Sequence, residues 1–302
     1  WWADKVFSAA LGEIPVTDSW RVRPSRRLVY MEETDSEKNV ILAENGESRH
    51  LTTGPDWHLY PDISERGDKV TLVSGPDADH LGVSVIDIAT GQKRLLSDRD
   101  GRDLHPTFSG DGKKIAFSDQ TGPESRRITI VDTPTFEAGF EPPNEKPRQI
   151  AVPGSDGGYF PALSEDGSRV VYQRSNDGKR EIGSYDFSTQ KEQVLAEGMS
   201  PSLSMDDQWL TYTRKVDGQW NIHLQNLESG ESRQVTRTPH LDFAPSFDGE
   251  GGIYFASNRA GTFDIYHLSA ENIAKGSEET TLIAQSPHPL YAPEADYPDK
   301  SL

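Results

Sequence analysis

Short apolar runs separated by polar turns recur along the whole chain, and several of them are apolar at consecutive positions. Examples are Ile115–Phe117, Val170–Tyr172 and Ile253–Phe255. A half-buried strand alternates apolar and polar residues, whereas a strand that is apolar at every position needs cover on both faces. The pattern therefore predicts an all-β protein in which each sheet is covered on both sides.

A short string precedes five of these runs: proline, two residues, serine or aspartate, two residues and, in four copies, glycine. Its prolines stand at positions 61, 106, 161, 201 and 245, so successive copies are 45, 55, 40 and 44 residues apart. The fourth copy has Asp207 where the others have glycine, and the longest interval holds a proline-rich insertion at residues 136–147. A recurring period of this length indicates a repeat architecture.

Each repeat continues with further apolar runs joined by pairs such as Asp-Gly, Asn-Gly and Ser-Gly, which favour tight hairpins. A sixth copy of this later part opens the chain at residues 27–52. Four strands in about 40–50 residues are typical of a propeller blade, whereas a solenoid would need capping repeats that the sequence does not show. We therefore predict one domain over residues 1–302, a six-bladed β-propeller of four-stranded antiparallel blades with its repeats at about residues 20–285.

The repeats leave two routes open for closing the ring. The first repeat lacks the proline string, and we expect residues 19–22 to supply its innermost strand. The ring is expected to be sealed by residues 6–11 or by residues 282–291, or the termini pack outside it. Residues 270–279 are expected to form a loop or a short helix inserted into the last blade.

Composition excludes several classes of partner and site. With 31 Lys and Arg against 49 Asp and Glu, the net charge is −18, which repels nucleic-acid phosphates. The chain has no cysteine, so disulfides, a thiol nucleophile and a cysteine-ligated zinc are excluded. No apolar run is long enough to span a membrane. Because the first residue is Trp1 rather than methionine, we expect a signal peptide or another upstream segment to have been removed.

The sequence offers little support for catalysis. It contains no Gly-x-Ser-x-Gly string for a nucleophilic serine, and no glycine-rich phosphate loop followed by a helix. The Asp-Gly pairs lack the alternating oxygen ligands and the closing glutamate of a calcium-binding loop, so we interpret them as turns. We expect a non-enzymatic protein without a cofactor, and leave open a calcium or other divalent cation bound elsewhere.

The residues just before each repeated proline form the main candidate site. In a propeller the innermost strand of each blade lines the central channel, so these residues are expected to surround one channel mouth. The candidates combine imidazole, carboxylate, aromatic and thioether groups: His58, Tyr60, Asp103, His105, Tyr159, Met199, Asp242 and Phe243.

Three interpretations of this set stay open. The first is that the residues hydrogen-bond loops and water at the channel rim. The second is a surface that binds a protein or peptide, because aromatic anchors with polar neighbours are typical of such sites. The third is a metal or acid–base site made by His58, Asp103, His105 and Asp242, whose side chains are suitable metal ligands.

The segment Ser257–Tyr266, with the sequence SNRAGTFDIY, and the proline repeats resemble the WD40-like repeats of the TolB family over about residues 20–285. Similar repeats occur in tricorn-type propellers and in the N-terminal propellers of prolyl oligopeptidase-like enzymes. The resemblance implies a periplasmic or secreted bacterial propeller that binds an envelope protein or peptide at the channel mouth. The alternative is a metal-dependent polysaccharide lyase or hydrolase that uses the His and Asp residues at this mouth.

Overall fold

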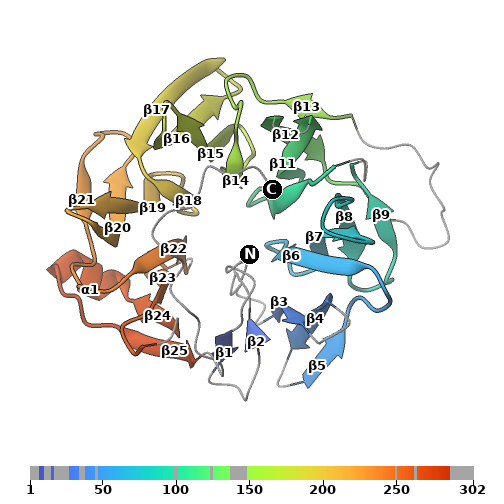
Figure 1. Ribbon diagram of the computed structural model, residues 1–302, viewed down its shortest axis with the longest axis horizontal. Coiled ribbons are helices and arrows are strands. Elements are labelled where there is room, and N and C mark those ends of the chain that lie inside the picture. Colours follow the sequence, from blue (N-terminus) through green and yellow to red (C-terminus); the bar gives the residue numbers. More distant parts are fainter. Residues whose placement is uncertain are drawn as a thin grey trace.

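The computed structural model describes residues 7–9, 15–16, 27–33, 38–44, 47–97, 101–122, 125–136, 148–248, 250–261 and 264–285. These residues form six sheets that stand side by side around a central axis, as Figure 1 shows. The predicted all-β propeller of antiparallel sheets is therefore confirmed. Within these residues, no helix has the length and the apolar composition to cross a membrane.

Four sheets have the predicted four antiparallel strands in chain order, and the first strand of each lies nearest the axis. Their strands are β6 (Trp57–Ile63), β7 (Lys69–Gly75), β8 (Gly82–Asp87) and β9 (Lys93–Leu95); β10 (Leu104–Phe108), β11 (Lys114–Gly122), β12 (Ser125–Asp132) and β13 (Ile150–Ala151); β14 (Tyr159–Leu163), β15 (Arg169–Asn176), β16 (Lys179–Asp186) and β17 (Lys191–Glu197); and β18 (Met199–Leu203), β19 (Trp209–Val216), β20 (Gln219–Asn226) and β21 (Ser232–Gln234).

Among the described residues, the first and last sheets do not have four strands. The first has three described strands, β3 (Arg27–Glu33), β4 (Lys38–Glu44) and β5 (Glu47–His50). Residues 19–22, expected to add its innermost strand, lie outside the described residues. The last sheet contains β22 (Asp242–Phe247), β23 (Ile253–Ser257), β24 (Asp264–Leu268) and β25 (Thr281–Gln285), and β1 (Phe7–Ala9) and β2 (Pro15–Val16) extend it to six strands.

The first and the last described strands meet in the last sheet. Strand β1 pairs with β25 in antiparallel register, with Ser8 opposite Gln285, and β2 lies against β3 of the first sheet. The described parts of the two segments expected to seal the ring, residues 7–9 and 282–285, therefore lie side by side at its seam. The insertion expected in the last blade is α1 (Ala270–Lys275), a short helix between β24 and β25.

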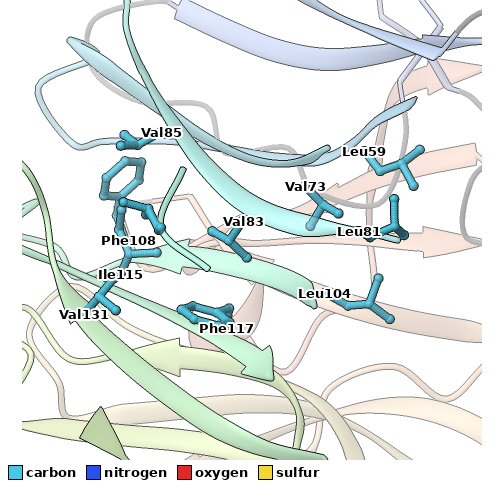
Figure 2. Close-up of a cluster of buried hydrophobic side chains, with 11 residues drawn as sticks. Leu59, Val73, Leu81, Val83, Val85, Leu104, Phe108, Ile115, Phe117 and Val131 are labelled. Atoms are coloured by element: carbon cyan, nitrogen blue, oxygen red, sulfur yellow. The ribbon is translucent and has the colours of Figure 1, made fainter. Parts of the chain in front are cut away.

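The hydrophobic core lies between neighbouring sheets rather than at the axis. Figure 2 shows the cluster between the β6–β9 and β10–β13 sheets, which includes Ile115 and Phe117. Ala116, between them on β11, packs in the next cluster with Leu163 and Tyr172. Adjacent residues of one strand thus enter two different interfaces, which explains why these strands are apolar at consecutive positions.

The repeated serine closes the turn after four of the innermost strands. The hydroxyl oxygens of Ser64, Ser109, Ser164 and Ser204 accept hydrogen bonds of 2.9–3.0 Å from the backbone N–H five residues later. The residue at the glycine position has a positive φ, which is 56° in Asp207. Aspartate tolerates this left-handed conformation better than most side chains.

Polar bonds also cross from one sheet to the next. Asp62, which is 5% exposed, accepts hydrogen bonds from the Thr107 hydroxyl at 3.1 Å and from the backbone N–H of Phe108 at 2.9 Å. The Asp207 carboxylate accepts from the backbone N–H of Glu165 at 3.0 Å. Each bond joins the innermost strand of one sheet, or the turn after it, to its counterpart in the adjacent sheet.

Replacing Asp62 with alanine is expected to lower the free energy of unfolding by about 2–3 kcal/mol, because the buried N–H of Phe108 would lose its acceptor. Thr107→Val removes the hydroxyl that donates to Asp62 but leaves the Phe108 bond in place, and it is expected to cost about 1 kcal/mol. Urea unfolding followed by circular dichroism would measure both values. If the two variants lost the same free energy of unfolding, the bond from Phe108 to Asp62 would not contribute as predicted.

Candidate functional site

The innermost strands share a backbone irregularity at the residue before each repeated proline. Tyr60, His105, Phe160, Ser200 and Ala244 have φ angles from 49° to 54°, in the left-handed region. In each sheet the pairing register of the innermost strand shifts at this point, as in a β-bulge. A left-handed conformation costs a residue other than glycine about 1–2 kcal/mol. The fold therefore holds five side chains in equivalent strained positions near one end of the channel, the channel mouth.

Three of these side chains form a continuous aromatic arc across neighbouring sheets. The rings of Tyr60 and His105 are 4.8 Å apart, and those of His105 and Phe160 are 3.9 Å apart. The next two sheets supply only Ser200 and Ala244 at the equivalent positions. The mouth therefore has an aromatic side and a side with small residues.

His105, in the middle of the aromatic arc, is held neutral. Burial, with a smaller contribution from the Arg126 guanidinium, lowers the pKa of His105 to about 3. Its buried Nδ1 has no hydrogen-bond partner among the residues that the structure describes. The Arg126 guanidinium lies over the ring of the neighbouring Tyr159, 5.3 Å from its centre. The arc thus combines apolar rings, a neutral imidazole and an adjacent cation.

The two predicted carboxylates are instead buried and hydrogen-bonded within the protein. Asp103, 4% exposed, accepts from the backbone N–H of Gln120 at 3.0 Å, and burial raises the pKa of its carboxyl to about 6. Asp242 is fully buried; it accepts from Arg259 at 3.2 Å and from the Thr238 hydroxyl at 3.0 Å. Both carboxylates therefore already bind groups of the protein itself.

Of the other predicted residues, some are buried in the interior and one lies beside the arc. His58 is 4% exposed, and Met199 and Phe243 are each 8% exposed, so these three form part of the packed interior. Tyr159 is half-buried beside the arc, 6.3 Å from the His105 ring. Across the described residues, no three His, Asp or Glu side chains are grouped so that they could hold a metal ion.

Phe160 is the arc residue that the predicted site set leaves out. Counting back from each proline would have found it, because Phe160 stands directly before Pro161 as Tyr60 stands before Pro61. The alternation of side chains along a regular strand gives no reason to prefer this position over the one before it. The bulge and the left-handed conformation determine which residue of the strand joins the arc, and both are properties of the folded strand.

His223 is a second buried imidazole, away from the arc. It lies on β20, is 6% exposed, and stacks on the Tyr212 ring at a centroid distance of 5.6 Å. Neither ring nitrogen has a partner among the described residues. Burial, with the nearby Arg214 and Arg237, lowers the pKa of His223 to about 4. The ring is therefore a neutral part of the core at pH 7.

Comparisons with known proteins agree with this architecture. No family model matches the chain. A segment of 121 residues, 38% of this chain, is 27% identical to the Tol-Pal system protein TolB of Rickettsia rickettsii and spans 26% of that protein. The structure of TolB from Acinetobacter baumannii matches with a TM-score of 0.64 at 19% identity, over 82% of this chain and 62% of that chain.

A puromycin-hydrolysing peptidase of Mycobacterium tuberculosis also matches in fold. Its TM-score is 0.65 at 13% identity, over 92% of this chain but 47% of the peptidase. This likeness therefore concerns the propeller fold alone. The proline repeats, the partial sequence match to TolB and the arrangement of the sheets together show a β-propeller that is similar to TolB.

His223 is expected to make the protein less stable in acid. Between its folded pKa of about 4 and the ordinary value of about 6.5, the unfolded chain binds a proton that the folded protein does not, so stability falls as the pH is lowered through this window. Wild-type protein should lose about 2–3 kcal/mol more than His223→Phe between pH 7 and pH 4.5. Urea unfolding at both pH values measures the difference.

The raised pKa of Asp103 has the opposite effect on stability. As the pH falls, the folded protein takes up a proton at Asp103 at a higher pH than the unfolded chain does, which stabilises the folded state. This effect is present in both proteins and cancels in the comparison. Equal acid losses in wild type and variant would show that His223 does not contribute.

Proposed function

We propose that this TolB-like β-propeller is a non-enzymatic binding protein of the bacterial envelope, periplasmic or secreted, whose ligand is a protein or peptide segment at the channel mouth. The curated relatives are named Tol-Pal system proteins, which supports an envelope partner. The matched segment spans only about a quarter of those relatives, so the partners of the whole TolB protein are not carried over as such.

The observation that carries the proposal is the aromatic arc. Tyr60, His105 and Phe160 keep large rings in a conformation that glycine would adopt at lower cost. Strained residues of this kind cluster at functional sites, where the surrounding structure maintains them. Aromatic side chains bury a large area with few rotatable bonds, which suits them to anchor a partner.

The asymmetry of the mouth indicates how a segment would bind. The rings occupy one side, and Ser200 and Ala244 leave more room on the other. We infer that the bound segment runs over the small residues and packs its side chains against the arc. Arg126, stacked on Tyr159, lies close enough to the arc to contact a polar group of the same segment.

The residue set predicted from sequence is accordingly revised within the proposal. Tyr60, His105 and Tyr159 remain contact residues, and Phe160 joins them. His58, Asp103, Met199, Asp242 and Phe243 are assigned to the packed layer that supports the arc, because they are buried. The alternative of a metal-dependent lyase or hydrolase receives no support from the described residues, which offer no metal-binding group.

Phe160→Gly is expected to reduce partner capture at least about tenfold, as loss of an aromatic hot spot does. Glycine relieves the left-handed strain and offsets part of the lost burial, so the melting temperature should change little. Capture is measured by cross-linking the purified protein to envelope extract and quantifying the bound proteins by mass spectrometry.

Ala244→Gly is the matched control, because it makes the same backbone change at an equivalent position without removing a ring. It should leave capture unchanged. Equal capture by wild type, Phe160→Gly and Ala244→Gly would place the binding surface elsewhere on the protein.

A further inference from the structure

A cavity lies between the β18–β21 sheet and the last sheet, at the opposite end of the strands from the channel mouth. Its volume is about 390 Å³, within the usual range of ligand pockets. The turn at Ser204–Asp206, after β18, and residues 250–251, after β22, line it. Because the mouth lies near the beginnings of the innermost strands and these turns follow their ends, the two sites are separate. We call this hollow the α1 cavity.

The walls of the α1 cavity are apolar and come from both sheets. Trp209 and Leu224 belong to one sheet, Phe247 to the other, and Ile273 to helix α1. These four side chains belong to one hydrophobic cluster or pack against it. The cavity is therefore a notch in the packed interface between two sheets.

Helix α1 is fixed in place as the outer wall. Ile273 is 5% exposed and anchors the helix in the core. The Ser269 hydroxyl caps the helix by accepting from the N–H of Asn272 at 3.2 Å, and the Arg233 guanidinium donates to the carbonyl of Ile273 at 2.8 Å. The cavity is thus formed before any ligand binds, which reduces the entropy cost of binding.

The rim combines an exposed apolar side chain with negative charge. Met205 is 45% exposed, and methionine adapts its shape to different partners. Two acidic residues, Asp206 and Glu250, belong to the lining and come from the two sheets. Among the described lining residues Arg233 is the one cation, and its guanidinium donates a hydrogen bond to the carbonyl of Ile273. The net charge of the lining is therefore negative.

We propose that the α1 cavity binds one large apolar side chain of an extended peptide segment in which that residue is flanked by lysine or arginine. The apolar walls select the anchor, and Asp206 and Glu250 attract the flanking cations. This site does not depend on the function proposed for the channel mouth.

Three short peptides with blocked ends test the proposal, with the central sequences Lys-Phe-Lys, Glu-Phe-Glu and Lys-Gly-Lys. Isothermal titration calorimetry at 50 mM salt should detect binding of Lys-Phe-Lys. Glu-Phe-Glu should bind at least fivefold more weakly, and Lys-Gly-Lys should show no measurable binding. Raising the salt to 500 mM should weaken Lys-Phe-Lys, because exposed charges are then screened.

Two variants locate the site, and a third serves as the control. Ala274→Trp places a ring at a lining position of α1 and should weaken Lys-Phe-Lys at least tenfold, whereas Lys275→Trp, outside the lining, should change its affinity less than twofold. Glu250→Lys should weaken it three- to fivefold. Thermal melting verifies that each variant is folded.

Unchanged affinity in Ala274→Trp, or equal binding of Lys-Phe-Lys and Lys-Gly-Lys, would overturn the cavity as the site. Equal binding of Lys-Phe-Lys and Glu-Phe-Glu would overturn the requirement for basic flanks.

Discussion

The architecture depends on the mutual burial of neighbouring sheets. Each central strand sends successive side chains into two different interfaces, as Ile115 and Ala116 do on β11. A sheet of this kind cannot bury both faces alone, so its stability depends on the sheets beside it. Inter-sheet bonds such as that from Phe108 to Asp62 fix the relative position of the innermost strands once the apolar faces have met. The packing of the sheets therefore also positions the residues of the channel mouth.

The sequence was sufficient to predict the ring, because both of its determinants are local. The proline string marks each innermost strand, and consecutive apolar positions such as Val170–Tyr172 reveal burial on two faces. The two strands that β1 and β2 add to the last sheet have no such marker. Strand β1 joins the last sheet through backbone hydrogen bonding to β25, which leaves no regular signature in side chains.

The candidate site was only half predictable, for a physical reason. The equivalent positions of the repeats predicted which strands surround the channel mouth. They did not predict which residue of each strand would contact a ligand. Asp103 and His105 are two residues apart and would share a face of a regular strand. The bulge separates them: His105 joins the aromatic arc, while Asp103 is buried against Gln120. The two ends of the propeller also differ in chemistry, with neutral rings at the mouth and carboxylates around the α1 cavity.

The pairing of β1 with β25 affects how the protein can be made. More than 270 residues separate Ser8 from its partner Gln285, so translation delivers the first long before the second. Intermediate sheets can assemble against one another while synthesis proceeds, since their strands follow in chain order. The joint between β1 and β25 must wait until residue 285 has been synthesised. Completion of the circle is therefore a late event, and until it occurs the outer sheets expose apolar surface that chaperones or aggregation could capture.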